Sequence, residues 1–154
     1  MAIRVQAEDF DVGAEYARLT DGRTDIGGVV MFAGLVRVFA AGSAVSAMTL
    51  EHYPGMTEKQ LAAIEDEARR RWSLDDVLII HRYGRLLPGD RIVLVITASA
   101  HRGDAFAACE FLMDWLKTRA PFWKLEETGE GERWVEAKDS DDAAADRWNN
   151  SKPA

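Results

Sequence analysis

The sequence has one cysteine, and its positive charge is outweighed by negative charge. Cys109 has no second cysteine to pair with, so no internal disulfide can form, and a reducing compartment is expected. Against 26 Asp and Glu there are 19 Lys and Arg, which gives a formal net charge of -7. A nucleic-acid-binding protein would show a basic face or stripe, so no nucleic-acid partner is expected. Any anionic ligand must therefore be bound by a local cluster of cations.

Long apolar runs and export signals are also missing. No apolar stretch approaches the ~18 residues that a membrane span needs, and residues 1–9 lack a charged region followed by an apolar one. There is no GxGxxG, no Walker-type GxxxxGK and no zinc-ligand spacing, and His52 and His81 lie in separate predicted strands. We expect a cytoplasmic protein with no membrane partner, no cofactor and no metal site.

The 154 residues suffice for one domain with a core of its own. No repeat, linker or low-complexity tract divides the chain, so residues 1–148 are expected to form a single domain and residues 149–154 a disordered tail. The apolar runs at 77–83 and 91–98 are joined through a Pro-Gly-Asp turn, which predicts a hairpin. Strands and helices mix without regular βαβα alternation, so the predicted class is α+β.

Several elements carry specific expectations. Residues 26–37 are almost continuously apolar, which predicts a strand buried on both faces. Residues 40–44 are small and predict a mobile loop, and Thr57 with Gln60 has the capping-box spacing that opens a helix. The arginines at 69–71 are interpreted as a solvated helix end rather than a binding patch. The other predicted elements are strands at 3–5 and 45–53, a helix at 12–19 capped by Asp11, and a last short helix ending near Trp148.

The segment from Ser99 to Lys124 predicts a strand end, a helix and a proline-stopped exit. Pro121 cannot continue a helix, so the chain should leave it there and run on as a strand. Ser99 is the predicted N-cap. The helix should bury one face, whose apolar residues recur at spacings of three and four: Ala105, Ala108, Cys109, Leu112, Met113 and Leu116. Cys109 is accordingly an inert core thiol rather than a nucleophile.

Cations flank both ends of this helix. Lys117 is placed at the edge of the apolar face and Lys124 beyond the corner; a partly buried lysine beside a second cation loses part of its charge and can act as base or nucleophile. The alternative, held equally, is that both lysines extend to solvent. His101 and Arg102 at the helix start suit a phosphate, although capping and solvation explain them as well. Arg37 ends the long apolar strand.

The length of this helix limits how these cations can cooperate. His101 and Lys117 are 16 residues apart. In a helix this is roughly 24 Å at 1.5 Å per residue, more than one small substrate can span. We therefore predict a composite pocket, in which a second copy of the chain places its helix start beside the lysines of the first across a two-fold axis.

Five motifs occur in order along the chain: Phe32-Ala-Gly-Leu-Val-Arg37, Leu50-Glu-His-Tyr-Pro-Gly-Met56, His81-Arg-Tyr-Gly-Arg-Leu86, Ala100-His-Arg102, and the stretch from Phe106 to Lys124. Together they resemble the large, catalytic subunit family of molybdopterin synthase, from about Phe10 to Trp148, and the last motif is highly specific. The resemblance implies an α/β hammerhead-type α+β fold, with a mixed or antiparallel sheet, packed helices and a small additional β subdomain.

The same resemblance implies a homodimer of large subunits, each binding a small ubiquitin-like subunit, in a heterotetramer. The small subunit's C-terminal thiocarboxylate donates sulfur to cyclic pyranopterin monophosphate (precursor Z), and two transfers form the dithiolene of molybdopterin. No cofactor is implied. The alternative function is a non-catalytic module that binds a ubiquitin-like tail or a phosphorylated metabolite. Partial burial of Lys117 would favour the enzyme, because a surface clamp does not need it.

Carried over by residue, the resemblance makes Lys117 and Lys124 the essential lysines. Arg37 of one copy, with His101 and Arg102 of its neighbour, would neutralise the substrate's anionic groups. Leu35 and Leu125 replace residues that are basic in many members, so backbone contacts are expected there. The implied substrate-binding set is Leu35, Val36, Arg37, His101, Arg102, Lys124, Leu125 and Glu126.

Overall fold

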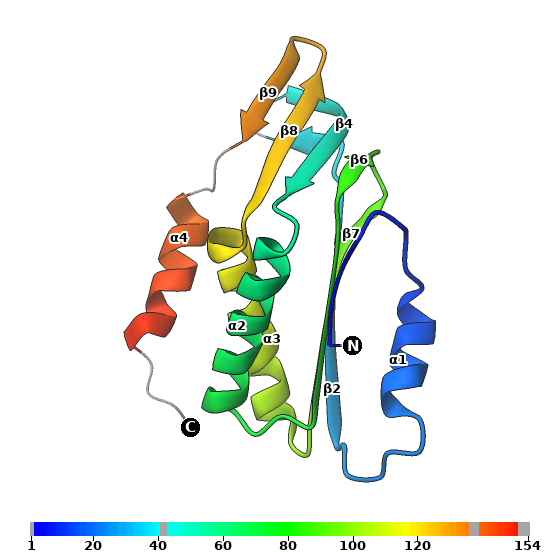
Figure 1. The fold of residues 1–154 in the computed structure, drawn as a ribbon, viewed down its shortest axis with the longest axis vertical. Helices are drawn as coiled ribbons and strands as arrows, with labels where there is room; N and C mark the ends of the chain where they lie inside the picture. Colours follow the sequence, from blue (N-terminus) through cyan, green and yellow to red (C-terminus); the bar gives the residue numbers. More distant parts are fainter. Residues whose placement is uncertain (1, 41–42, 136–138, 151–154) are drawn as a thin grey trace.

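The structure is a computed structural model that describes residues 2–40, 43–135 and 139–150 (Figure 1). Helices and strands mix along the chain, as the α+β prediction requires. The elements are β1 (Ile3–Gln6), α1 (Val12–Thr20), β2 (Gly28–Leu35), β3 (Phe39–Ala40), β4 (Ser43–His52), α2 (Met56–Arg71), β5 (Asp76–Arg82), β6 (Gly84–Leu86), β7 (Arg91–Ser99), α3 (Arg102–Arg119), β8 (Phe122–Thr128), β9 (Gly131–Val135), α4 (Asp139–Asp146) and the 3-10 helix η1 (Arg147–Asn150).

Within the described ranges the strands form two sheets. The first has the order β1-β5-β7-β2, with β1 parallel to β5 and the other pairs antiparallel. The second has the order β3-β4-β8-β9, with β6 also paired to β4, and all its pairs are antiparallel. The predicted hairpin between β5 and β7 is confirmed, and the second sheet is the expected additional β part.

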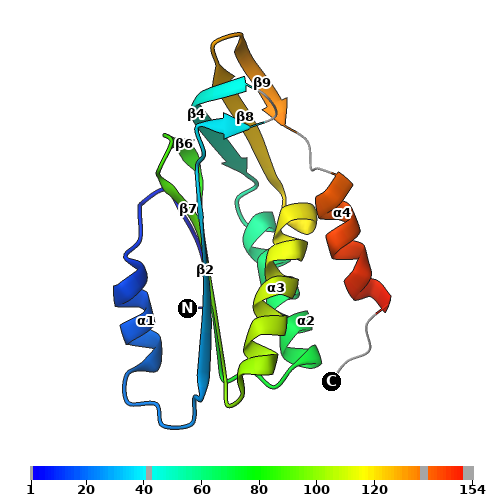
Figure 2. The ribbon, with the colours of Figure 1, turned by 180° about the vertical axis from the view of Figure 1, so that it is seen from behind.

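Helices cover both faces of the first sheet. α1 lies on one face, α2 and α3 lie on the other, and α4 lies outside α3 (Figures 1 and 2). Alternate side chains of β5 therefore enter different cores: Val77 and Ile79 pack with α2 and α3, while Leu78 and Ile80 pack on the side of α1. A third cluster joins the two sheets and consists of Val36, Met48, Leu50 and Leu86.

The prediction that the strand at 26–37 is buried on both faces is wrong. In the described part of the chain β2 pairs with β7 alone, so it is an edge strand. Its residues Met31, Phe32 and Leu35 are 45%, 41% and 53% exposed. The strands buried on both faces are β5 and β7, which have a neighbour on each side and helices above and below. β2 thus presents an apolar edge at the surface.

The predicted capping box of α2 is misplaced. α2 begins at Met56 with Gly55 as N-cap, and Glu58 Oε2 accepts a hydrogen bond from Gly55 N at 2.6 Å. Thr57 is buried instead: its hydroxyl donates to the Pro121 carbonyl at 3.1 Å and accepts from Tyr53 N at 2.9 Å. Thr57 thereby ties the start of α2 to the corner between α3 and β8.

The end of α2 also differs from its prediction, because only part of the arginine triplet is solvated. Arg71 is 7% exposed, and its Nη1 donates to the Trp148 carbonyl at 2.7 Å. Its guanidinium lies 4.9 Å from the centre of the Phe111 ring and 5.5 Å from that of Trp115. Arg71 therefore joins α2, α3 and the C-terminal segment.

The Arg71→Ala variant is expected to lose about 2–4 kcal/mol of unfolding free energy, because it removes cation–π contacts and leaves the half-buried Trp148 carbonyl without its arginine donor. Arg70→Ala is the matched control: its side chain is 70% exposed and pairs with Glu67 at the surface. The control should cost at most about 0.5 kcal/mol. Urea unfolding followed by circular dichroism measures both, and equal losses would contradict the structural role of Arg71.

Two predicted segments fall partly outside the described residues. Of the predicted loop at 40–44, residues 41–42 are not described; β3 ends at Ala40 and β4 begins at Ser43. Of the predicted tail at 149–154, residues 151–154 are not described, while η1 runs through Asn150 and Arg119 Nη2 donates to Asn149 Oδ1 at 3.2 Å. No helix in the described ranges is long and apolar enough to cross a membrane.

Candidate active site

Two predicted site lysines flank the corner where α3 passes into β8 (Figure 1). Lys117 lies in the last turn of α3 and Lys124 on β8. Ala120 is extended, with φ of -78° and ψ of 132°, and Phe122 N donates to its carbonyl at 2.9 Å, so the proline-stopped exit is confirmed. We call Lys117, Lys124 and this turn the lysine corner.

His81, on β5, lies at the lysine corner and was not among the predicted site residues. Its ring stacks on Phe122, with ring centres 3.7 Å apart and planes inclined by 18°. Its Nδ1 donates to the Arg82 carbonyl at 2.9 Å. Burial, and the nearby positive charges of Lys117 and Lys124, lower the pKa of His81 from its usual 6.5 to about 4. The imidazole is therefore neutral at neutral pH and close to both lysines.

Strand pairing decides which predicted residues share a face with Lys124. Lys124 is opposite Leu50 and Glu126 is opposite Met48 in the antiparallel pair of β4 and β8, so both point to the face that carries these apolar residues. Glu126 is 3% exposed, and its Oε2 lies 3.6 Å from Arg133 Nη2. Leu125 points to the opposite face of β8, because it lies between Lys124 and Glu126 and side chains alternate along a strand.

The end of β2 lies on the same side of the molecule as the lysine corner. Val36 is buried against Leu50, the register partner of Lys124, and its N–H donates to the Asp90 carbonyl at 2.9 Å. Leu35 and Arg37, on either side of it, are exposed. Val36 thus fixes the backbone here, while the Arg37 side chain remains accessible.

His101 and Arg102 lie at the other end of the molecule, where α3 and β2 begin (Figures 1 and 2). A Cβ on Gly27 would lie 2.0 Å from the Ala100 carbonyl oxygen, so only glycine permits this close approach of the two segments. His101 is the N-cap and has no side-chain capping bond; the prediction of Ser99 as N-cap is wrong, because its Oγ donates to the Ser73 carbonyl at 2.7 Å. Both site residues are exposed.

The predicted set therefore divides into two groups. Lys117, Lys124 and the residues near β4 and the end of β2 gather where α3 ends and the second sheet begins, and the two cations at the start of α3 lie at the opposite end of that helix (Figure 1). α3 has 18 residues. At 1.5 Å per residue it is about 27 Å long, as the length argument required.

Lys117 is exposed, so its predicted partial burial is wrong. The buried side of α3 packs on α2 and the sheet, whereas the stripe that holds Phe106 and Lys117 faces outward; Phe106 is 60% exposed. Burial of Lys117 therefore gives no means of separating a catalytic lysine from a surface clamp.

Other chemistry-bearing groups have structural explanations. Cys109 is buried, as predicted, and burial raises the pKa of its thiol to about 11, so it stays protonated at neutral pH. In the described ranges no three His, Cys, Asp or Glu side chains cluster so that they could hold a metal ion.

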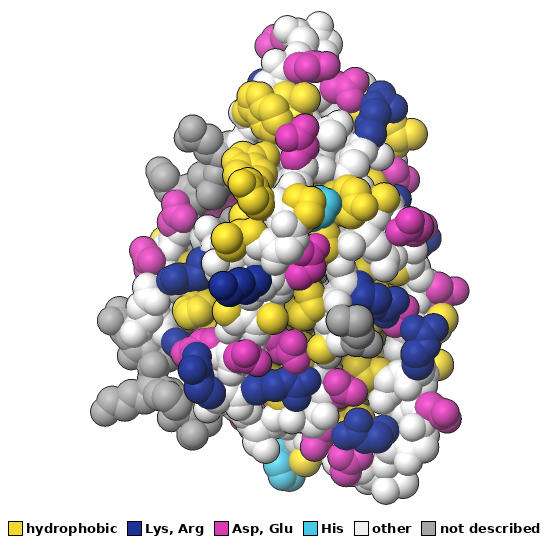
Figure 3. Space-filling view, viewed as in Figure 1, with side chains coloured by type: hydrophobic (Ala, Val, Ile, Leu, Met, Phe, Trp, Pro, Cys, Tyr) yellow, Lys and Arg dark blue, Asp and Glu magenta, His cyan; other side chains and the backbone are white. Residues whose placement is uncertain are grey.

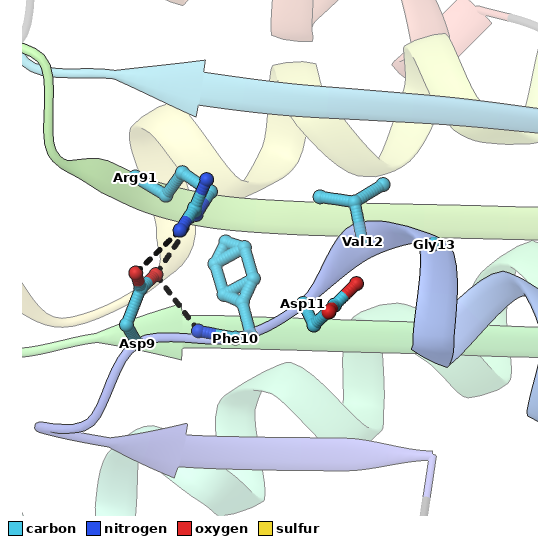
Figure 4. Close-up of a pocket in the computed structure, with 6 residues that line it drawn as sticks. All are labelled: Asp9, Phe10, Asp11, Val12, Gly13 and Arg91. Atoms are coloured by element: carbon cyan, nitrogen blue, oxygen red, sulfur yellow. Dashed lines mark hydrogen bonds and ion pairs between the residues drawn. The ribbon is translucent and has the colours of Figure 1, made fainter.

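A surface pocket on the α1 side of the first sheet is unrelated to the predicted site (Figure 4). Asp9, one of its lining residues, accepts hydrogen bonds from Arg91 Nε at 2.9 Å and Nη2 at 2.6 Å. The Arg91 hydrogen bond holds the pKa of Asp9 down at about 2. Since its carboxylate is already paired, Asp9 joins the segment before α1 to β7 rather than serving a ligand.

Exposed apolar side chains gather over the upper part of the molecule, where the second sheet lies (Figure 3). Tyr53, Trp123 and Trp134 from this region are exposed, and the rings of Tyr53 and Trp123 are 6.2 Å apart. An apolar surface therefore borders the lysine corner.

Residues 5–119 match a family model described as MoaE protein. The chain belongs to the MoaE family. A relative from Ralstonia nicotianae, named molybdopterin synthase catalytic subunit, is 61% identical over 95% of this chain and 83% of its own length. The family resemblance drawn from the five motifs is thus confirmed.

Solved structures of MoaE relatives support the fold as well. The structure of a molybdopterin biosynthesis MoaE protein from Burkholderia ambifaria has a TM-score of 0.80 and 57% identity, and the match covers 96% of this chain and 98% of that one. A structure of molybdopterin synthase from Staphylococcus aureus has a TM-score of 0.80 at 32% identity and covers 88% of this chain and 98% of that one. The predicted α+β class, with its hammerhead-type arrangement, is confirmed.

Proposed function

We propose that this chain acts as the catalytic subunit of a molybdopterin synthase. It transfers sulfur from the C-terminal thiocarboxylate of a small ubiquitin-like subunit to cyclic pyranopterin monophosphate. Each transfer breaks the carbon–sulfur bond of one thiocarboxylate and forms a carbon–sulfur bond on the substrate. The acyl carbon that loses sulfur gains an oxygen, displaced from the substrate or supplied by water, and leaves as a carboxylate. The lysine corner carries this proposal, since it sets two cations at an accessible turn in a chain 61% identical to a named catalytic subunit.

Each lysine has a role that follows from its position. Lys117 is exposed at the end of α3, where an incoming C-terminal tail can reach it, and it acts at the carbon that receives sulfur. Lys124 is half-buried on β8 and assists by charge or proton transfer. Glu126, on the same face as Lys124, completes the polar lining with its ion pair to Arg133.

A second copy completes the pocket. β2 is an exposed apolar edge of eight residues, about 27 Å long at 3.4 Å per residue, which matches the length of α3. The start of β2 lies beside His101, and Arg37 follows its end. A two-fold axis near the middle of β2 would exchange these ends and bring the partner subunit's His101 to Arg37, while covering Met31, Phe32 and Leu35.

The composite pocket accounts for anion binding. Arg37, with the partner subunit's His101 and the partner subunit's Arg102, neutralises the cyclic phosphate through charge-assisted hydrogen bonds. Leu35, Val36 and Leu125 lack polar side-chain atoms, so they contact the substrate through backbone groups or apolar atoms. The assembly is a homodimer of this chain with one small subunit on each copy, a heterotetramer.

The cellular setting follows from the chemistry. A thiocarboxylate donor and a free cysteine both suit a reducing compartment, so we place the protein in the cytoplasm. No nucleic-acid or membrane partner is involved.

A single-turnover assay tests the function. The chain is mixed with partner subunit carrying a ³⁵S-labelled thiocarboxylate and with cyclic pyranopterin monophosphate, and the label is followed by chromatography. Label should leave the partner and appear in molybdopterin, two atoms per product. A binding module would retain the partner while its sulfur stayed in place, and that result would overturn the assignment.

A further inference from the structure

We infer that His81 is a positioning residue for the sulfur-transfer reaction: its uncharged ring, stacked on Phe122, holds the first residues of β8 against β5, beside the end of α3, and so sets where Lys124 stands relative to Lys117. This inference rests on the proposed function for its kinetic consequence.

The first support is the place of His81 in the sheet. Val77, Ile79 and His81 alternate along β5 and share the face that packs on α2 and α3. His81 is the last of the three, so it lies where α3 ends. Its strand neighbours on both sides are apolar: Val5 of β1 and Val93 of β7.

The second support is the contact with Phe122. Ring centres 3.7 Å apart and planes within 18° describe a face-to-face contact in which each half-buried ring covers the other. Phe122 is the first residue of β8 and precedes Lys124 by two positions, so the two side chains share a face of the strand. A shift of Phe122 therefore moves Lys124 with it. On its other flank Phe122 is opposite His52 in β4, which stacks on Tyr83 at 4.1 Å.

The third support is the orientation and charge of the imidazole. A carbonyl oxygen can only accept, so the 2.9 Å contact to Arg82 O requires hydrogen on Nδ1 and fixes the ring in one tautomer when it is neutral. The charged groups that bear on the ring are Lys117 of α3 and Lys124 of β8, with His52 of β4 as a third titratable group. A protonated His81 would add a third cation beside the two lysines. The low pKa of His81, about 4, keeps it from doing so at neutral pH.

Two substitutions distinguish the contribution of the His81 ring from that of its hydrogen bond. His81→Phe keeps an uncharged ring and loses the N–H donor, whereas His81→Gln keeps a donor and loses the ring. We expect His81→Gln to lower kcat about 10-fold or more, with KM for the thiocarboxylated partner within about threefold, because misplacement of a reacting group costs rate rather than binding. His81→Phe should keep kcat within about threefold of the unaltered protein.

Ile79→Ala is the matched control. It removes a fully buried side chain two residues earlier on the same face of β5, away from the lysines, and should lower thermal stability while leaving kcat unchanged. The kcat–pH profile of His81→Phe should match that of the unaltered protein from pH 5.5 to 7.5. An inflection lost in this variant would mean that His81 carries a proton in the reaction, and equal loss of kcat in both His81 variants would exclude the stacked ring as the cause; either result overturns the inference.

A second readout does not depend on activity. Amide hydrogen exchange at residues 122–124 should be about 10-fold faster in His81→Gln and unchanged in His81→Phe and Ile79→Ala, since local opening of β8 follows the loss of its stacked ring. If the unaltered protein makes no molybdopterin, the proposed function fails while exchange still tests the positioning role. Unchanged exchange in His81→Gln would overturn that role.

Discussion

Replacing Lys117 by alanine is expected to abolish product formation from cyclic pyranopterin monophosphate and thiocarboxylated partner. Loss of the side chain removes the amine that meets the donor's thiocarboxylate and acts at the carbon receiving sulfur. Groups that transfer protons or stabilise developing charge contribute about 100-fold or more to rate. Because Lys117 is exposed in the last turn of α3, and α3 is anchored by its opposite face, the substitution should leave the fold intact. Stopped turnover measured by product chromatography would confirm the role.

Partner binding is the internal control for this experiment. Calorimetry should give an affinity for the small subunit within about threefold of the unaltered protein, since one lysine contributes little to an interface of ordinary size. Arg70→Ala, which removes an exposed cation from α2, should change neither turnover nor binding. Near-normal turnover in Lys117→Ala would rule out the assignment.

The Lys117→Arg variant then separates two chemical roles. Arginine keeps the positive charge but does not lose its proton in proteins. Recovery of turnover identifies Lys117 as an electrostatic clamp, and continued inactivity identifies it as the group that accepts a proton.

Mixing two inactive variants should restore activity if each pocket draws on two copies of the chain. One variant carries Lys117→Ala, and the other carries His101→Ala with Arg102→Ala. In a mixed dimer one pocket contains both defects, and the other combines an intact Lys117 with the partner subunit's intact His101. Half the dimers are mixed after random exchange, and each has one working pocket, so activity should reach about a quarter of that of the unaltered protein.

Two measurements accompany the mixing experiment. Differently tagged chains allow mixed dimers to be purified, and these should have about half the activity per dimer. Dilution below the dimer dissociation constant should remove activity in proportion to the loss of dimer, measured by light scattering. Recovery absent from verified mixed dimers, or full activity in monomers, would show that each chain holds a complete site.

Helical spacing and the conformational limits of proline were sufficient to predict the helix, its end and the following strand in the segment that contains the lysines. The spacing of apolar residues in α3 and the stop at Pro121 depend only on neighbours in sequence. The exit at Pro121 is observed, and the predicted face is buried except for Met113, which is half-buried, while Phe111 is buried although it was not predicted. Motif order along the chain likewise identified the family, because a long specific motif needs no three-dimensional information. The positions of Lys117 and Lys124 at a corner follow from these rules alone.

Side-chain burial was the property that the sequence predicted least well, because segments with similar sequence patterns pack against different neighbours in the fold. The apolar run in β2 resembles those of β5 and β7, yet β2 is at the sheet edge. Arg70 and Arg71 are adjacent in one helix, and only Arg71 meets Phe111 and the C-terminal segment. In both cases the burial of the side chain depends on which distant segment packs against it. Neither the hydropathy pattern nor the helical period predicts that segment.

The sequence by itself determined the class of fold, most of its elements, the family and the lysine pair, because these depend on local periodicity, turn chemistry and ordered motifs. Only the tertiary structure decided that Lys117 is exposed, that β2 forms an apolar edge, and that His81 from β5 stacks beneath the lysine corner. Strand order and helix docking join residues dozens of positions apart, and such contacts exist only once the whole chain has packed.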